Sequence, residues 1–205
     1  MNIREYNVNE VVSFKLTTAP FGALSNMAQG FSLNINSVII PSSEHLYQAC
    51  KFPLFPSLQE EIFNQPTPKA AKLLAHKNNA LNRQDWNSVR VKVMRWALEV
   101  KLLQNRNRFS AVLGETGNRA IIEDSNKDDF WGASRQGEKF IGTNALGRLL
   151  MELREKYIIS ATSLKSVNPP LISGFLILDS EIGKVHNYVF EDNYAFNAEE
   201  LASDC

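Results

Sequence analysis

The 205-residue sequence predicts a single-domain α+β protein that is mainly helical. The first observation is a helical repeat of apolar residues over 85–105, the longest periodic segment in the chain. A second amphipathic repeat begins at residues 142–144 and continues to residue 157. Alternating or β-branched runs are short, so they predict only a small β element beside these helices.

In the first half of the chain, the helix starts carry the clearest local signals. Ser42 or Ser43 can cap a helix, because either hydroxyl can accept a hydrogen bond from an N–H of the first turn. Asp85 is expected to cap the long helix in the same way. The predicted elements are a strand over 11–18, a hairpin over 31–40 with its turn at 36–37, a helix from 44, and helices over 57–64 and from 67.

The second half of the chain mixes short elements with one long polar stretch. Residues 124–143 have the composition of a loop, with three glycines and four acids, and Trp131 indicates that this loop is ordered. The other predicted elements are a helical turn over 109–113 and strands over 120–123, 171–178 and 185–190. The last fifteen residues are acidic and are predicted to be partly disordered.

Composition excludes several classes of function. The 22 basic and 22 acidic side chains balance, so no overall field would gather nucleic acid or anionic lipid, and only a local basic cleft is compatible with such a partner. Cys50 and Cys205 do not form a disulfide framework, and no signal peptide or membrane-spanning run is evident, so we expect a cytoplasmic protein without membrane contact. The three histidines stand far apart, so we expect no metal site.

The stretch 41–52 places several functional groups at helical spacing. Glu44, Tyr47, Gln48 and Lys51 stand at i, i+3, i+4 and i+7, so a helix would carry them on one face. A carboxylate, a phenol, an amide and an amine would then reach toward one ligand. On spacing alone, a capped surface helix with Glu44 and Lys51 as solvated charges is an equally good interpretation.

Five sequence blocks spread over residues 14–157 add information that no single block carries. They are Phe21-Gly22 with residues 24–26, the Pro-Ser-Ser-Glu-His and Tyr-Gln-Ala motifs with Lys-Phe over 41–52, Trp86 with residues 89–98, Glu123-Asp124-Ser125 with Asp128 and residues 130–132, and Gly142 with residues 144–154. In this order the blocks resemble the NADAR family, also called the YbiA-like family.

The resemblance implies a mostly helical YbiA-like fold and a hydrolase that cleaves N-glycosidic bonds of ADP-ribose-type nucleotides. It implies no metal and no organic cofactor. It divides the chain into a catalytic domain over 1–157 and a C-terminal extension over 158–205, whose strands are expected to pack on the core. The preferred substrate is ADP-ribose on guanine in DNA or RNA, an antitoxin-like activity that implies an ADP-ribosyltransferase toxin as partner.

Other functions remain open at this point. The enzyme could instead act on ribosylated pyrimidine intermediates of riboflavin synthesis, and the zero net charge weakly favours such a small substrate. A non-catalytic sensor of ADP-ribose or NAD would use the same pocket without turnover. A structural interaction module would not need polar groups converging on one helix face.

Three residues are candidates for catalysis. Cleavage of a ribosyl C–N bond develops positive charge at the anomeric carbon, which the carboxylate of Glu44 or Asp128 can stabilise. Glu44 at a helix N-terminus is expected to stay ionised, because the helix dipole favours the anion. Lys51 offers a second route, attack on the opened ribose to form an imine, although it can equally be a charge partner for Glu44 or a phosphate.

The substrate-binding candidates fall into two groups and a remainder. Trp131 is expected to stack against a base, with Phe21, Tyr47 and Trp86 as further candidates, although core packing is the better expectation for Trp86 and Trp96. The helix start at Gly142 and Asn144, with Arg148 one turn on, is expected to cradle a pyrophosphate. The remaining candidates are Asn26, Ser43, Gln48, Arg90, Gly132 and Thr143.

Overall fold

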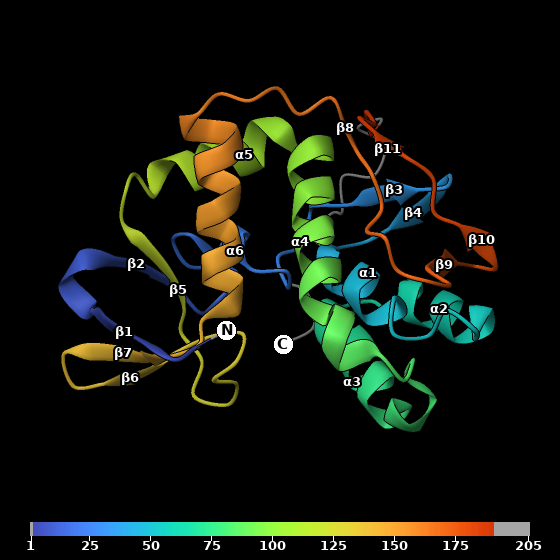
Figure 1. Ribbon diagram of the computed structural model, residues 1–205, viewed down its shortest axis with the longest axis horizontal. Helices are drawn as coiled ribbons and strands as arrows, with labels where there is room; N and C mark the ends of the chain where they lie inside the picture. The colour runs from blue at the N-terminus through green and yellow to red at the C-terminus, as the bar shows by residue number, and fades with distance from the viewer. Residues whose placement is uncertain (1, 191–205) are drawn as a thin grey trace, which may run out of the picture.

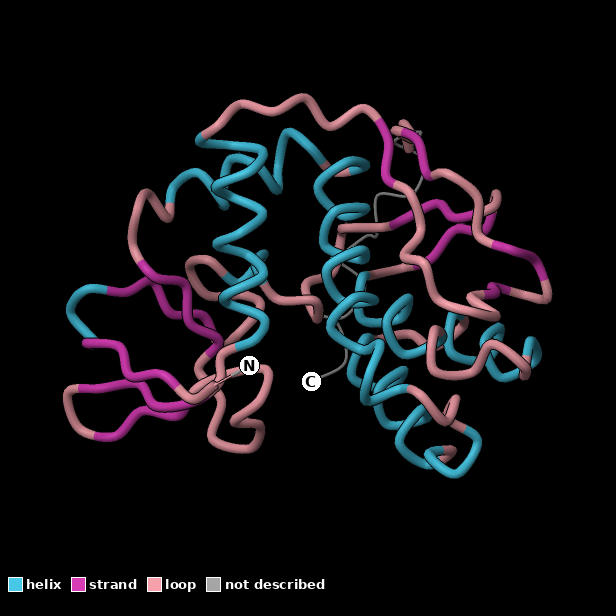
Figure 2. The backbone as a smooth tube through the Cα atoms, viewed as in Figure 1, coloured by secondary structure: helices cyan, strands magenta, loops and turns pink. Residues whose placement is uncertain are grey.

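Two helices, α4 (Trp86–Gln104) and α6 (Ala145–Arg154), run side by side through the middle of the molecule (Figure 1). The computed structural model describes residues 2–190 of the chain. Short helices and small strand pairs lie on the α4 side, and a three-stranded sheet with a further strand pair lies on the α6 side (Figure 2). This arrangement confirms the predicted α+β class and the single domain.

Helix α4 forms where the apolar repeat predicted it, and the repeat faces the core. Its buried stripe consists of Val89, Val93, Trp96, Ala97, Val100 and Leu103. Each fully buried large side chain of this kind stabilises the fold by about 1.5–3 kcal/mol. The predicted cap is wrong, because the carboxylate of Asp85 accepts hydrogen bonds from the guanidinium of Arg83 at 2.6 and 3.1 Å and none from the helix.

A hairpin delivers the chain to the first helix, as predicted. Strands β3 (Leu33–Ile35) and β4 (Val38–Ile40) pair antiparallel, and Asn36 and Ser37 between them have φ values of 51° and 66°. Two positive φ angles in a two-residue loop match the twist of the flanking strands. Helix α1 (Ser43–Ala49) follows, and its N-cap Ser42 accepts a hydrogen bond from the backbone N–H of His45 at 3.4 Å.

Two further helices pack around α1. They are α2 (Pro56–Phe63) and α3 (Pro68–Lys77), and each begins with proline. Proline lacks a backbone N–H, but the first N–H groups of a helix have no partner within the helix, so no hydrogen bond is lost. Thr67 caps α3 by accepting a hydrogen bond from the N–H of Ala70 at 3.1 Å. A 3-10 turn over Asn79–Leu81 leads into the segment before α4.

On the α6 side, the chain forms more β structure than the sequence predicted. Strand β2 (Val11–Phe14) is shorter than predicted and pairs parallel with β5 (Ala120–Glu123). The stretch predicted as a loop contains β6 (Ser134–Gln136) and β7 (Lys139–Gly142), which form a sheet with β1 (Arg4–Asn7) in the order β1-β7-β6. These strands are mostly exposed, so they lack an apolar pattern that would have revealed them.

Helix α5 (Arg106–Glu115) is longer than predicted, and the chain after α6 passes through a π turn over Glu155–Ile159. The C-terminal extension then crosses α4 and forms two short strand pairs instead of the two longer strands predicted. These pairs are β8 (Ser166–Val167) with β11 (Val185–His186), and β9 (Leu176–Ile177) with β10 (Ser180–Glu181).

The acidic tail over 191–205 lies outside the described residues. Within residues 2–190, no helix combines the length and apolar character needed to cross a membrane.

Candidate active site

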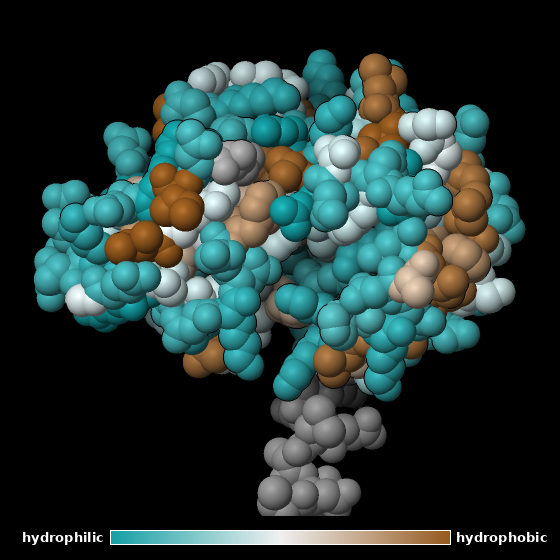
Figure 3. Space-filling model, turned by 60° about the horizontal axis from the view of Figure 1, so that its bottom comes forward, coloured by the Kyte–Doolittle hydropathy of each residue, from teal (hydrophilic) through white to brown (hydrophobic). Residues whose placement is uncertain are grey.

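A cleft of about 240 Å³ opens where α1, α4 and the loop after β5 meet. The molecule is hollowed between its two flanks on the face shown in Figure 3. The cleft brings together most of the predicted site residues, namely Asn26, Glu44, Tyr47, Gln48, Lys51, Trp86, Arg90, Asp128 and Trp131. It also contains residues that the sequence did not single out, namely Ser25, Met27, Lys72, Met94, Glu123, Ser125 and Leu146.

Helix α1 supplies the floor of the cleft through Glu44, Tyr47 and Gln48, all of which are buried. The side-chain amide of Gln48 donates a hydrogen bond to Oε1 of Glu44 at 2.7 Å. Lys51 lies in the turn beyond the helix rather than on it, and its N–H bonds to the carbonyl of Gln48 at 3.2 Å. The predicted face therefore exists, with Lys51 brought into it by the turn.

Burial acts on the charge of Glu44 in the opposite direction to the helix start. Burial raises the pKa of the Glu44 carboxyl, and the nearby Lys72, Gln48 and Lys51 oppose this increase only in part. The carboxylate loses hydration on burial, and this loss disfavours the anion that the helix start favours. Glu44 is therefore closer to protonation than a helix-start position alone would indicate, which suits a group that exchanges protons.

Lys51 is perturbed in the direction that favours nucleophilic chemistry. Burial lowers the pKa of its amine, while the negative charge of Glu44 acts in the opposite direction. Its Nζ lies 5.6 Å from the centre of the Trp86 ring, so one side of the amine faces an aromatic surface. The amine of Lys51 therefore loses its proton more easily than the amine of a surface lysine.

Aromatic side chains form one wall of the cleft. Tyr47 lies between Trp86 and Trp131, with ring centroids 5.0 and 5.7 Å away. Trp86 packs half-buried against the core, as expected, and also lines the cleft, whereas Trp96 is 2% exposed and belongs wholly to the core. Arg90 lies over the ring of Phe130 at 3.7 Å from its centroid. The wall offers flat apolar surface and a cation, both suited to a nucleobase or nucleotide.

The loop after β5 is held in shape by Asp128. Its Oδ1 accepts hydrogen bonds from the N–H groups of Phe130 and Trp131 at 3.1 and 2.9 Å. Gly132 packs so closely that an added Cβ would lie 2.5 Å from the carbonyl oxygen of Glu123. Asp128 lines the cleft, and the adjacent Asp129 is exposed and does not. Asp128 therefore positions the wall as well as offering a carboxylate.

Glu123 is the important residue that sequence reasoning missed. It ends β5 and faces the cleft, and burial raises the pKa of its carboxyl to about 7, with smaller contributions from Glu44 and Asp128. Three carboxyl groups thus share one cleft, and the negative charges of the other two add to the raised pKa of Glu123. The available signal was an acid at the end of a short apolar strand, directly before an ordered loop.

The predicted pyrophosphate cradle is absent, because the backbone amides at the start of α6 already have partners. The N–H groups of Thr143 and Asn144 donate to the carbonyls of Asp129 and Gly132 at 2.8 and 2.9 Å, and those of Ala145 and Leu146 donate to Phe130 and Trp131. Gly142 packs against the backbone of Gly132, and Arg148 does not line the cleft. Leu146 lines the cleft, whereas the other residues at the start of α6 support the wall from behind and do not line the cleft.

Asn144 has a structural role that the sequence did not indicate. Its side chain donates a hydrogen bond to the carbonyl of Ile121 at 2.8 Å and accepts one from the N–H of Glu123 at 3.1 Å. It therefore fixes the strand that carries Glu123. Phe21, with a φ of 63°, and Ser43, which is buried, also lie outside the cleft lining.

Several cleft residues have polar atoms with no partner inside the described part of the protein. They are Oδ1 of Asn26, Oε1 of Gln48, Nε of Arg90 and Oε2 of Glu123, all of them buried. Buried polar atoms are normally hydrogen-bonded, so these four atoms are available to a ligand or to water in the cleft. Among residues 2–190, no group of His, Cys, Asp and Glu side chains has the arrangement needed to hold a metal ion.

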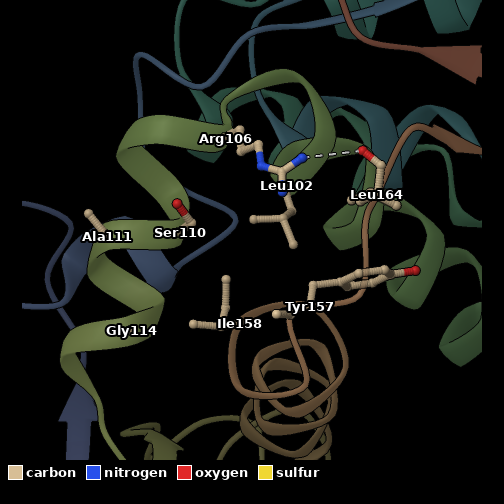
Figure 4. Close-up of a pocket in the computed structure, with 9 residues that line it drawn as sticks. Leu102, Arg106, Ser110, Ala111, Gly114, Tyr157, Ile158 and Leu164 are labelled. Atoms are coloured by element: carbon tan, nitrogen blue, oxygen red, sulfur yellow. Dashed lines mark hydrogen bonds between the residues drawn. The ribbon is translucent and has the colours of Figure 1, made fainter.

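A second hollow, of about 380 Å³, lies between α5 and the chain after α6 (Figure 4). Its lining is mainly apolar, with Leu102, Ile158 and Leu164 beside the guanidinium of Arg106, which donates to the carbonyl of Leu164 at 3.5 Å. It contains no carboxylate and none of the predicted site residues. The perturbed carboxyl and amine groups instead mark the first cleft, where they have the character of an enzyme active site.

Comparison with known proteins agrees with the α+β fold described above. The NADAR domain family model matches residues 13–157. The N-glycosidase YbiA of Escherichia coli is 34% identical over 149 residues, which cover 73% of this chain and 89% of the relative. The riboflavin biosynthesis protein VVA0006 of Vibrio vulnificus is 38% identical over 125 residues, which cover 61% of this chain and 33% of that longer protein.

The NMR structure of Escherichia coli YbiA is similar to this fold with a TM-score of 0.62 and 33% sequence identity, covering 74% of this chain and 86% of that one. The chain therefore belongs to the NADAR family. The family match ends at residue 157, so the C-terminal extension lies beyond it.

Proposed function

We propose that this protein is an N-glycosidase that removes ADP-ribose from guanine in nucleic acid. The observation that carries the proposal is the cleft, where Glu44, Asp128, Glu123 and Lys51 face the same space as an aromatic wall. Membership of the NADAR family and the name of the Escherichia coli relative support the N-glycosidase class.

In the first route, the carboxyl groups carry the reaction. The C–N bond breaks with its electron pair going to the base, and positive charge develops at the anomeric carbon. The carboxylate of Glu44 or Asp128 stabilises that charge and takes a proton from the water that adds to the carbon. Glu123 suits the opposite task, because a carboxyl with a pKa of about 7 can donate a proton to the departing base nitrogen near neutral pH.

In the second route, Lys51 acts as a nucleophile. Its neutral amine adds to the anomeric carbon of the ring-opened sugar and displaces the base nitrogen, which leaves with a proton. Water then hydrolyses the lysine imine, which releases the sugar aldehyde and regenerates Lys51. The lowered pKa of Lys51 favours this route, and the carboxylates would then serve as proton donors and acceptors.

Substrate recognition follows from the wall and the cations. The flat faces of Trp86 and Trp131 can stack with a base, and Lys72 and Arg90 offer positive charge to phosphates. A guanine flipped out of the nucleic acid would present only a local contact surface, so a protein of zero net charge can bind it. An ADP-ribosyltransferase toxin acting on guanine would supply the substrate, which makes the activity antitoxin-like.

A second candidate is hydrolysis of a ribosylated pyrimidine nucleotide of riboflavin synthesis. The name of the Vibrio vulnificus relative supports it, and a cleft of about 240 Å³ suits a small nucleotide. A sensor that binds ADP-ribose without turnover would use the same walls, but it would not need three carboxyl groups and a lysine in one place.

Product analysis separates these functions. The protein is incubated in parallel with an oligonucleotide carrying ADP-ribosylguanine and with a free ribosylaminopyrimidine phosphate, and the products are identified by mass spectrometry. Release of ADP-ribose with unmodified guanine supports the first proposal, and cleavage of only the free nucleotide supports the second. Tight binding of ADP-ribose without cleavage of either substrate would contradict both and indicate a sensor.

A further inference from the structure

The C-terminal extension is attached beside the cleft by a buried glutamine. Gln59 in α2 is 0% exposed, and its side-chain nitrogen donates to the carbonyl of Ala49 at 3.1 Å and to that of Leu176 at 3.0 Å. Its side-chain oxygen accepts a hydrogen bond from the N–H of Leu178 at 2.8 Å. One amide therefore ties the end of α1, two residues before Lys51, to strand β9 of the extension.

Arg83 makes a second connection to the same turn. Its backbone N–H donates to the carbonyl of Lys51 at 2.8 Å, and its guanidinium donates to the carbonyl of Ser173 at 2.8 Å and more weakly to that of Gly174 at 3.5 Å. Its own carbonyl accepts the N–H of Trp86 at 3.1 Å. The Arg83 side chain is 9% exposed, while its hydrogen bonds to the Ser173 and Gly174 carbonyls lie at the surface.

Packing completes the attachment. Phe175, between the two points of contact, meets Trp96 of α4 edge to face at 5.2 Å, and both rings are buried. The extension is therefore held on three sides, by α2, by the segment before α4 and by α4 itself. Figure 1 shows it crossing α4 before it reaches the region of α1 and α2.

We propose that the C-terminal extension, acting through Gln59 and Arg83, positions Lys51 in the cleft, an inference that rests on the function proposed above. Lys51 stands in a turn outside α1, so helical hydrogen bonds alone do not hold it. Gln59 holds the carbonyl at the end of the helix, and Arg83 holds the carbonyl of Lys51 itself. Gln59 and Arg83 are positioning residues, because neither one lines the cleft.

The chain contains a matched control for this role. Gln104 in α4 also bridges the extension and another element, since its side-chain nitrogen donates to the carbonyls of Asn34 and His186 at 2.9 and 3.0 Å and its oxygen accepts the N–H of Asn34. It is similarly buried, at 7% exposure. Its partners are in β3 and β11, and its hydrogen bonds do not involve α1 or the turn with Lys51. Gln59→Met and Gln104→Met thus remove comparable bonds with different consequences.

The test compares the two variants in two measurements. Trace acetylation of the whole protein over a pH series, with quantification of the Lys51 peptide by mass spectrometry, reports the pKa of that amine and needs no substrate. Steady-state kinetics on the substrate that the product analysis identifies reports kcat and KM. We expect Gln59→Met to shift the Lys51 pKa toward the ordinary lysine value and to lower kcat about tenfold, because a loosened turn admits water and misplaces the amine. Gln104→Met should lower Tm to a similar degree without either change.

Other outcomes would overturn the inference. A Gln59→Met protein with lower Tm but wild-type Lys51 reactivity and kcat would make Gln59 a structural contact only. Equal effects of Gln104→Met on Lys51 would indicate general loosening instead of positioning. Arg83→Gln is the second variant if Gln59→Met does not fold, and it should change Lys51 in the same direction. If the wild-type protein cleaves no substrate, the proposed function fails while the acetylation series still decides whether the extension positions Lys51.

Discussion

Replacing Glu44 by glutamine tests both the chemistry and the electrostatics of the cleft. The Glu44→Gln substitution keeps the size of the side chain, and the amide oxygen can still accept the hydrogen bond from Gln48 that is now 2.7 Å long. The substitution removes only the charge and the exchangeable proton. Loss of a positioned catalytic group of this kind lowers turnover by about a hundredfold or more, or roughly 2.7 kcal/mol in activation free energy.

The same substitution has a predicted effect on stability, with a definite sign. The pKa of Glu44 is raised in the folded protein above its ordinary value of 4.5, so between these two values the folded state binds more protons than the unfolded chain. The free energy of unfolding therefore falls as pH rises through that window, by about 1.4 kcal/mol for each unit between the two pKa values. The free energy of unfolding of Glu44→Gln does not fall in this way, because glutamine does not ionise. We therefore expect the variant to gain stability relative to the wild-type protein at neutral pH.

The assay combines turnover with urea unfolding at pH 4.5 and pH 8 for the wild-type protein, Glu44→Gln and Asp129→Asn. Asp129 is a nearby acid that is exposed and outside the cleft, so its variant controls for a change in net charge. Wild-type turnover in Glu44→Gln would remove Glu44 from the chemistry. A stability difference from the wild type that is the same at both pH values would refute the argument from its buried charge.

Three further predictions test separate parts of the site. Lys51→Arg keeps the charge but cannot form an imine, so it should abolish turnover and the borohydride-trapped ADP-ribosyl adduct on the Lys51 peptide, and an active variant would exclude the nucleophilic route. Asn144→Ala should destabilise the fold by about 2–3 kcal/mol in urea unfolding, because it breaks two hydrogen bonds to β5, and unchanged stability would contradict that role. Gly132→Ala should destabilise by about 1–3 kcal/mol and lower activity, because its Cβ would strike the Glu123 carbonyl, whereas Gly183→Ala, with open space, should do neither.

The sequence alone determined the features whose causes lie within a few residues. Ser42 and Thr67 cap helices because their hydroxyls need only the next turn of chain as partners. The turn of the β3–β4 hairpin and the apolar repeat of α4 are also local properties. The face with Glu44, Tyr47 and Gln48 followed from helical spacing, so a large part of the candidate site could be predicted.

Tertiary structure decided what depends on burial and on distant partners. Strand β7 pairs with β6 beside it and with β1, more than a hundred residues earlier, and the side chains of β6 and β7 carry little pattern. Only packing shows that Glu44 and Glu123 share one desolvated cleft, which raises the pKa of both. The amides at the start of α6 looked available in the sequence, but a neighbouring loop supplies their acceptors.

Lys101 shows the same division most clearly. On the α4 sequence it is an ordinary helix lysine, yet the fold leaves it 0% exposed, with Nζ donating to the carbonyls of Ala23 and Ser25 at 2.6 and 3.0 Å and lying over the rings of Phe31 and Phe109. Burial lowers the pKa of its amine to about 7. The sequence determines the spacing of a side chain along a helix, but its exposure to water depends on every segment that packs against it. Exposure to water in turn sets the pKa values of the carboxyl and amine groups in the cleft.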